Sequence, residues 1–183
     1  HASLWVDNED SVLDVGCGLG DFYKFLMKKK RITYLGIDTF EPYIAECNKQ
    51  LINAQVMDLS EIMNEYDVIS SIGTFHIGFD SDSIKKSIEK LWKHTNKDLI
   101  FSVLTDAPTK DYTAIKESDI IEFVKSLTAN YVVYKDIRGE LMMVLERKPM
   151  TFDYMKSQIK RIFANEVGDR EVELNKNVVI KET

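Results

Sequence analysis

The chain is poor in the residues that mark several large classes of protein. It has two cysteines, three prolines and three scattered histidines among its 183 residues. Two cysteines are too few for a disulfide framework, and scattered histidines give no metal-ligand spacing. We therefore expect reduced thiols in a cytoplasmic protein, and no bound metal.

Long apolar runs and an excess of positive charge are also missing. No apolar stretch approaches the roughly 20 residues that span a bilayer, and the first residues carry Asp7, Glu9 and Asp10 instead of the basic and apolar regions of a signal peptide. We therefore expect no membrane partner. The formal net charge of −6 argues against a broad nucleic-acid surface but leaves a local basic patch open.

What the chain does contain is a glycine-rich turn between an apolar strand and a helix. The strand at 11–15 is followed by Gly16, Gly18 and Gly20 at alternate positions, and Asp14 lies just before the turn. Glycines leave the backbone bare, so that a ligand can approach the main-chain N–H groups closely. The turn is therefore the first candidate binding site.

A second apolar strand ends in Asp38, eighteen residues after Gly20. A carboxylate at this position can accept two hydrogen bonds from a ribose diol. The glycine spacing differs from the G-x-G-x-x-G of dinucleotide-binding turns, and Asp21 at the helix start would repel a pyrophosphate. These features predict a ligand with an adenosine end and an amino-acid end, whose ammonium group is attracted to Asp14.

The motif Asp14-Val15-Gly16-Cys17-Gly18-Leu19-Gly20 resembles the glycine motif of class I S-adenosylmethionine (SAM)-dependent methyltransferases. The resemblance continues in order over roughly residues 11–147. Asp38 matches the ribose-binding acid, Val56-Met57-Asp58-Leu59 the segment that contacts adenine, and Tyr66-Asp67-Val68-Ile69-Ser70-Ser71 the fourth strand, which leads into the active site.

This resemblance implies a set of cofactor-binding residues. The glycines would shape the turn under the amino-acid end, and Asp14 would anchor its ammonium group directly or through water. Asp38 would take the ribose hydroxyls, and Asp58 would accept from the exocyclic amine of adenine. The full expected set is Asp14, Gly16, Gly18, Gly20, Asp38, Thr39, Phe40, Met57, Asp58, Ser71, Ile72 and Gly73.

The segment Gly73-Thr74-Phe75-His76-Ile77-Gly78 follows the fourth strand at the edge where ligands bind. His76 is the candidate catalytic residue, because an imidazole can accept a proton near neutral pH; an ordinary hydrogen-bonding histidine is the alternative. Phe75 is a candidate wall of the substrate pocket, and Tyr112 a candidate substrate contact. His94 lies at the opposite edge, and we expect it to be structural.

Strands and helices alternate along the chain and predict a three-layer α/β sandwich with a Rossmann-like, mostly parallel sheet of seven strands. We expect strands at 11–15, 32–38, 54–57, 67–72 and 99–104, and helices at 21–29, 42–51, 83–93 and 118–127, the last capped by Ser118. The strands at 131–137 and 141–147 predict an antiparallel hairpin. In the first helix we expect Phe22, Phe25, Leu26 and Met27 to face inward.

We expect residues 1–149 to form the methyltransferase domain, with an N-terminal lid that is short or truncated, and residues 150–183 to form an appendage. Met155, Ile159, Ile162 and Phe163 predict one apolar helical stripe, and 171–174 and 178–180 a small hairpin. The appendage either packs on the same domain or forms a homodimer contact or a docking element for a partner.

The leading functional hypothesis is methyl transfer from SAM to an oxygen or nitrogen of a small molecule. The fourth strand does not end in the N/D-P-P-Y/F sequence of adenine amino methylation, and no Pro-Cys nucleophile is present for cytosine chemistry. Two alternatives to this hypothesis stay open. One is a methyltransferase that acts on RNA or protein, and the other is a SAM-binding partner protein without catalytic activity.

Overall fold

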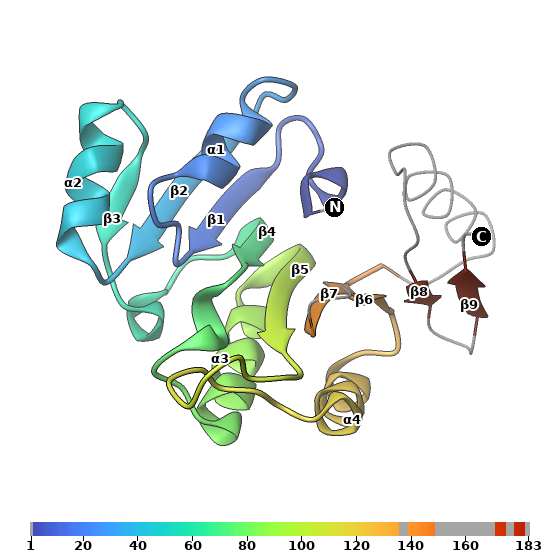
Figure 1. Ribbon diagram of the computed structural model, residues 1–183. Helices are drawn as coiled ribbons and strands as arrows, with labels where there is room; N and C mark the ends of the chain where they lie inside the picture. Colours follow the sequence, from blue (N-terminus) through green and yellow to red (C-terminus); the bar gives the residue numbers. More distant parts are fainter. Residues whose placement is uncertain (1, 136–138, 149–170, 175–177, 182–183) are drawn as a thin grey trace.

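The computed structural model describes residues 2–135, 139–148, 171–174 and 178–181 (Figure 1). Three short 3-10 turns are labelled η. In chain order the elements are η1 Ala2–Trp5, β1 Ser11–Val15, α1 Asp21–Leu26, β2 Thr33–Asp38, α2 Glu41–Lys49, β3 Ala54–Val56, η2 Leu59–Glu61, β4 Tyr66–Ser71, η3 Thr74–His76, α3 Ser81–Lys93, β5 Thr95–Leu104, α4 Glu117–Leu127, β6 Tyr131–Lys135, β7 Glu140–Glu146, β8 Glu171–Leu174 and β9 Val178–Lys181.

The strands form one sheet in the order β3-β2-β1-β4-β5-β7-β6-β8-β9. Strands β1 to β5 are parallel to one another, and β7 returns antiparallel between β5 and β6. The predicted fold class is therefore confirmed. Among the described residues the sheet has nine strands instead of seven, because the predicted hairpin of β8 and β9 pairs with β6. The predicted helical stripe at 155–163 lies outside the described residues.

Helices cover both faces of the sheet, as Figure 1 shows for α1 and α2 on one face and α3 and α4 on the other. Along β1, Leu13 and Val15 point into the core under α3 and α4, whereas Val12 points into the core under α1 and α2. This alternation follows from the two-residue period of a strand. Both sides of the central strands are buried, which explains their nearly continuous apolar sequence.

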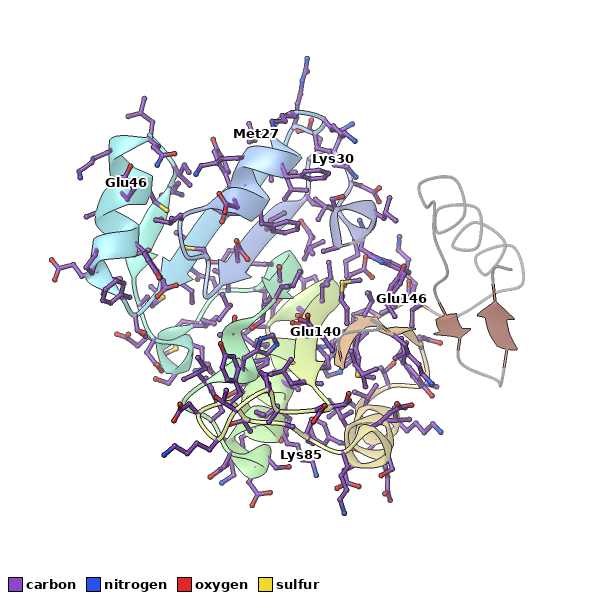
Figure 2. All side chains as sticks on the ribbon, in the orientation of Figure 1. Met27, Lys30, Glu46, Lys85, Glu140 and Glu146 are labelled. Atoms are coloured by element: carbon purple, nitrogen blue, oxygen red, sulfur yellow. The ribbon has the colours of Figure 1, made fainter. Side chains whose placement is uncertain are left out.

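Each of the four helices differs from its predicted range by one to three residues at one end or both, and two of these differences matter for packing and capping. The first helix, α1, ends at Leu26, whose side chain is fully buried. Phe25 is exposed rather than inward, and so is Met27 (Figure 2). The last helix, α4, is capped by Lys116 rather than Ser118. Its acidic first turn, with Glu117 and Asp119, suits the positive end of the helix dipole.

The parallel pairing brings the predicted site residues to one edge of the sheet. Val15 is the register partner of Ile37, and Asp14 that of Ser70, so β1, β2 and β4 end at nearly the same height. The chain passes from β1 outward to β2 and β3 and then back to β4 on the other side of β1. Ligands of open α/β sheets bind at such a switch in strand order, beyond the carboxyl ends of the strands.

No helix in the described part of the chain is long and apolar enough to cross a membrane.

Two buried carboxyl groups lie side by side near the opposite edge. Asp98 of β5 and Glu146 of β7 are register partners, and Glu140 and Glu146 mark the two ends of β7 (Figure 2). Burial and, to a smaller extent, the negative charge of Glu146 together raise the pKa of Asp98 to about 7, although the ammonium group of Lys97 opposes the change.

We predict that Asp98→Asn stabilises the fold at pH 8 and changes little at pH 4. The pKa of Asp98 is about 7 in the folded protein, against an ordinary value of 3.8 that applies to the unfolded chain. The charged carboxylate therefore destabilises the fold increasingly as the pH rises from about 4 to about 7. The shift corresponds to a gain of at most about 4 kcal/mol in the free energy of unfolding. Urea unfolding at both pH values, with the exposed Asp82→Asn as control, measures it. A gain independent of pH would contradict this account.

Candidate functional site

A cleft of about 490 Å³ opens at the carboxyl ends of β1, β2 and β4. This volume is in the usual range for sites that hold a small molecule. The cleft is lined by Val15, Gly16, Gly18, Ile37, Asp38, Thr39, Tyr43, Met57, Asp58, Leu59, Ile72, Gly73, Thr74, Ile77, Gly78 and Phe79.

Most of the residues expected to hold the cofactor lie at this cleft. They come from the glycine turn, from the ends of β2 and β3, and from the segment after β4: Gly16, Gly18, Asp38, Thr39, Met57, Asp58, Ile72 and Gly73. The four others, Asp14, Gly20, Phe40 and Ser71, are not among the lining residues. Ser71 is fully buried, and a side chain at Gly20 would collide with Ile52.

Two glycines of the turn are required for different reasons. Gly16 has a φ of +71°, and a Cβ there would lie 2.4 Å from Oγ1 of Thr74. That hydroxyl donates to the carbonyl oxygen of Val15 at 2.7 Å and ties η3 to the turn. Gly18 has a φ of +53°, yet a Cβ there would meet nothing within 4 Å. Packing therefore requires glycine at position 16, whereas at position 18 the bare backbone faces the open cleft.

Asp38 links the glycine turn to the loop that follows β2. Its Oδ2 accepts a hydrogen bond from the Gly18 N–H at 3.0 Å, and its Oδ1 accepts one from the Phe40 N–H at 2.9 Å. A carboxylate has about four acceptor sites, so two of them remain for a ligand. This side chain lines the cleft and is held in place before any ligand arrives.

Asp14 lies below the turn and is only 5% exposed. It alternates with Val15 along β1, so its carboxyl group points to the other face of the sheet and accepts a hydrogen bond from the Tyr34 hydroxyl at 2.8 Å. Burial raises the pKa of Asp14 to about 7, although the hydrogen bond from Tyr34 acts in the opposite direction. This position does not suit direct contact with an ammonium group in the cleft.

The aromatic residues near the cleft differ from those expected. Phe40 is 52% exposed and meets Tyr43 edge-on, with 4.8 Å between ring centroids, and it is Tyr43 that lines the cleft. Phe75 is fully buried and packs edge-on against Phe79, which lines the cleft in its place. Tyr112 is partly exposed on the loop after β5 and is not a lining residue.

Sequence analysis did not single out Tyr43 and Phe79. Tyr43 lies in the first turn of α2, and its position three residues after Phe40 is the signal that could have found it. Phe79 directly follows Gly78, the last residue of the segment considered after β4.

Among the described residues, the charged side chains that line the cleft are Asp38 and Asp58, and no Lys, Arg or His lines it. The carboxylate of Asp58 accepts from the Ser60 N–H at 2.8 Å and caps η2. Hydrogen bonds from Ser60 hold the pKa of Asp58 below its usual range. The cleft is therefore negatively charged, which favours a cationic ligand and disfavours a pyrophosphate.

His76 ends η3 and lies next to lining residues without being one. Its Nε2 is 3.5 Å from Oε1 of Glu140, and its carbonyl oxygen accepts from the Thr113 N–H at 2.8 Å. His94 caps α3 at the opposite edge, where its Nδ1 lies 3.1 Å from the carbonyl oxygen of Asn64. Within the described ranges, no group of three or more His, Cys, Asp or Glu side chains is arranged to hold a metal ion.

Residues 12–98 match the family model described as a methyltransferase domain. This segment belongs to the methyltransferase-domain family. The match confirms the resemblance to class I methyltransferases drawn from the glycine motif, and SAM is the cofactor of that class. A comparison with curated proteins finds no match.

Solved structures similar to this methyltransferase domain have the same fold. Magnesium protoporphyrin IX methyltransferase from Synechocystis PCC 6803, solved with bound SAH, has a TM-score of 0.66 at 17% identity over 77% of this chain and 75% of its own. The N-methyltransferase NodS from Bradyrhizobium japonicum WM9 has a TM-score of 0.61 at 18% identity, over 81% and 91% of the two chains. TehB from Haemophilus influenzae has a TM-score of 0.62 at 20% identity, over 76% and 58%.

We predict that alanine at the two glycines separates stability from binding. Gly18→Ala should cost about 1 kcal/mol for the left-handed backbone and should greatly weaken SAM binding, because its methyl group projects into the cleft. Gly16→Ala should cost more stability, because Thr74 must also move. Urea unfolding and calorimetric titration with SAM measure both effects. If Gly18→Ala binds SAM as the wild type does, position 18 does not face the ligand.

Proposed function

We propose that this chain transfers a methyl group from SAM to an oxygen or nitrogen of a small-molecule acceptor. The observation that carries the proposal is the pairing of the Gly18 N–H with the Asp38 carboxylate at the wall of an acidic cleft. It gives a nucleoside a ribose acceptor beside bare backbone, at the switch in strand order where such ligands bind.

The residues present fit SAM. Gly18 leaves open space above the turn, and Asp38 keeps acceptor sites for the two ribose hydroxyls. Met57 and Asp58 then bound the adenine, and Tyr43 offers it an aromatic face. When bound, SAM supplies a methyl group on a positively charged sulfur, and the two carboxylates of the cleft lining favour this charge.

The chain's own contribution to the reaction is alignment and exclusion of water. The methyl carbon is already activated in SAM, so the protein has to hold the acceptor in line with it. Ile72, Gly73 and Ile77 follow β4 and line the cleft on the side away from Asp38's loop, and Ile77 is 57% exposed at its rim. These residues give the described part of the rim an apolar surface against which an acceptor can be held.

The acceptor class is supported by one similar structure, which is a magnesium protoporphyrin IX methyltransferase and so acts on a small molecule. Methylation of RNA or protein would use the basic side chains Lys156, Lys160 and Arg161, near the predicted stripe, as a docking surface. This stripe lies outside the described residues. We further propose that residues 1–149 are the catalytic domain and 150–183 an appendage, and that the protein is cytoplasmic, in keeping with the free thiols of Cys17 and Cys47.

Calorimetric titration tests the cofactor assignment. We predict a micromolar dissociation constant for SAM or its demethylated product, on the order of −8 kcal/mol, and no binding of NAD. Asp38→Ala should abolish measurable affinity, and Asp38→Asn should weaken it at least about 10-fold, since each hydrogen bond to a carboxylate contributes about 1.5–3 kcal/mol. Asp21→Asn removes an equal charge outside the cleft and should bind normally. Binding of NAD in preference to SAM would refute the assignment.

Acceptor screening with mass detection tests the reaction. A defined mixture of phenols, aliphatic alcohols and amines should gain a methyl group in the presence of the protein and SAM. Methylation of RNA or protein instead, with binding that weakens steeply as salt rises, would contradict the small-molecule acceptor. SAM binding without transfer to any of these would indicate the partner protein without catalytic activity.

A further inference from the structure

We infer that Glu140 positions His76 as the general base that removes a proton from the methyl acceptor, which therefore presents a hydroxyl or a protonated amine. The inference rests on the proposed function and deepens it. His76 was a candidate from its sequence position alone, and Glu140 was not a candidate at all. What joins them is their juxtaposition in the fold, with His76 Nε2 3.5 Å from Glu140 Oε1.

The fold brings these residues together from distant parts of the chain. His76 follows β4, and Glu140 begins β7 as the register partner of Leu104, the last residue of β5. Because β7 runs antiparallel, its first residue lies at the edge where the parallel strands end. Figure 2 shows Glu140 at this edge and Glu146 at the far end of the same strand. The carboxylate thus reaches the ligand-binding edge although its strand points the other way.

Both partners stand on backbone that is held in place. The carbonyl oxygen of His76 accepts from the Thr113 N–H, and the start of η3 is fixed by a hydrogen bond from the Gly73 N–H to Oγ of Ser102 at 2.9 Å. Next to Glu140, the carbonyl oxygen of Gly139 accepts from both the N–H and the hydroxyl of Thr105. A side-chain pair on such supports keeps its geometry while a substrate binds.

The orientation of the imidazole ring assigns different roles to its nitrogens. Nε2 is buried and makes no hydrogen bond within the described part of the chain, and Oε1 of Glu140 lies 3.5 Å from it. With its proton on Nε2 directed at the carboxylate, the ring keeps the lone pair on Nδ1 for a substrate. The two side chains are 17% and 29% exposed, so both are largely shielded from solvent. A separation of 3.5 Å shortens readily when a substrate closes the site.

The proton transfer balances with methyl transfer. The acceptor's hydroxyl or ammonium proton moves to Nδ1 of His76, and the electron pair left on oxygen or nitrogen forms the new bond to the methyl carbon. The bond between that carbon and sulfur breaks, and its electron pair stays on sulfur, which becomes a neutral thioether. The proton on the imidazolium then leaves to solvent, and no oxidant or reductant is consumed.

Nuclear magnetic resonance of the 15N-labelled imidazoles tests the pair without an acceptor. In the wild type the neutral ring of His76 should carry its proton on Nε2, and Glu140→Gln should remove or weaken this preference. The resonances of His94, which lies at the opposite edge, should not change. A His76 ring protonated on Nδ1 in the wild type would overturn the inference.

Kinetics on the mixture of phenols, alcohols and amines tests the catalytic role. We expect His76→Ala to lower kcat about 100-fold or more while the affinity for SAM changes less than 3-fold, and added imidazole to restore part of the rate. Glu140→Gln should lower kcat about 10-fold, and Glu140→Asp should recover part of it. His94→Ala is the control and should keep the wild-type rate.

The outcomes separate this inference from the proposed function. If the wild type methylates an acceptor and His76→Ala does so within 3-fold of its kcat, the base is not His76 and the inference is wrong. If the wild type does not bind SAM, the proposed function is wrong, whatever the protonation of the imidazole.

Discussion

The hydrogen bond from the Gly18 N–H to the Asp38 carboxylate is the interaction on which the candidate site depends. It joins the turn after β1 to the end of β2 and fixes the distance between bare backbone and acidic side chain. The same carboxylate accepts from the Phe40 N–H and so orders the loop that enters α2. One side chain thereby organises one wall of the cleft before a ligand binds, which reduces the cost of ordering the site on binding.

The strand order determines what this wall can meet. Because β4 lies on the other side of β1 from β2, the segment after β4 faces the glycine turn, and Thr74 ties it there by donating to the carbonyl oxygen of Val15. The reversal of β7 then adds Glu140 to the same edge, beside His76. The wall of the cleft that carries Gly18 and Asp38 comes from parallel strands. The proposed pair of His76 and Glu140 needs the antiparallel strand β7, which distinguishes this fold from a fully parallel sheet.

Local sequence predicted the strands and helices well, and it singled out glycines at a turn and an acid after an apolar strand that line the cleft, because such residues act through the backbone where they stand. It does not determine where a side chain points. Strand alternation turns Asp14 toward Tyr34, and helix and loop geometry brings Tyr43 and Phe79 into the cleft lining rather than Phe40 and Phe75. Glu140 lies 64 residues after His76 in the sequence, and only tertiary structure pairs them.

A crystal structure of the protein with the demethylated product of SAM tests the central claim most directly. The account predicts the ribose hydroxyls on the Asp38 carboxylate and the amino-acid end over Gly18, with the bond between the Gly18 N–H and Asp38 intact. An ordered glycine turn with the compound bound elsewhere, or with an empty cleft at saturating concentration, would contradict it.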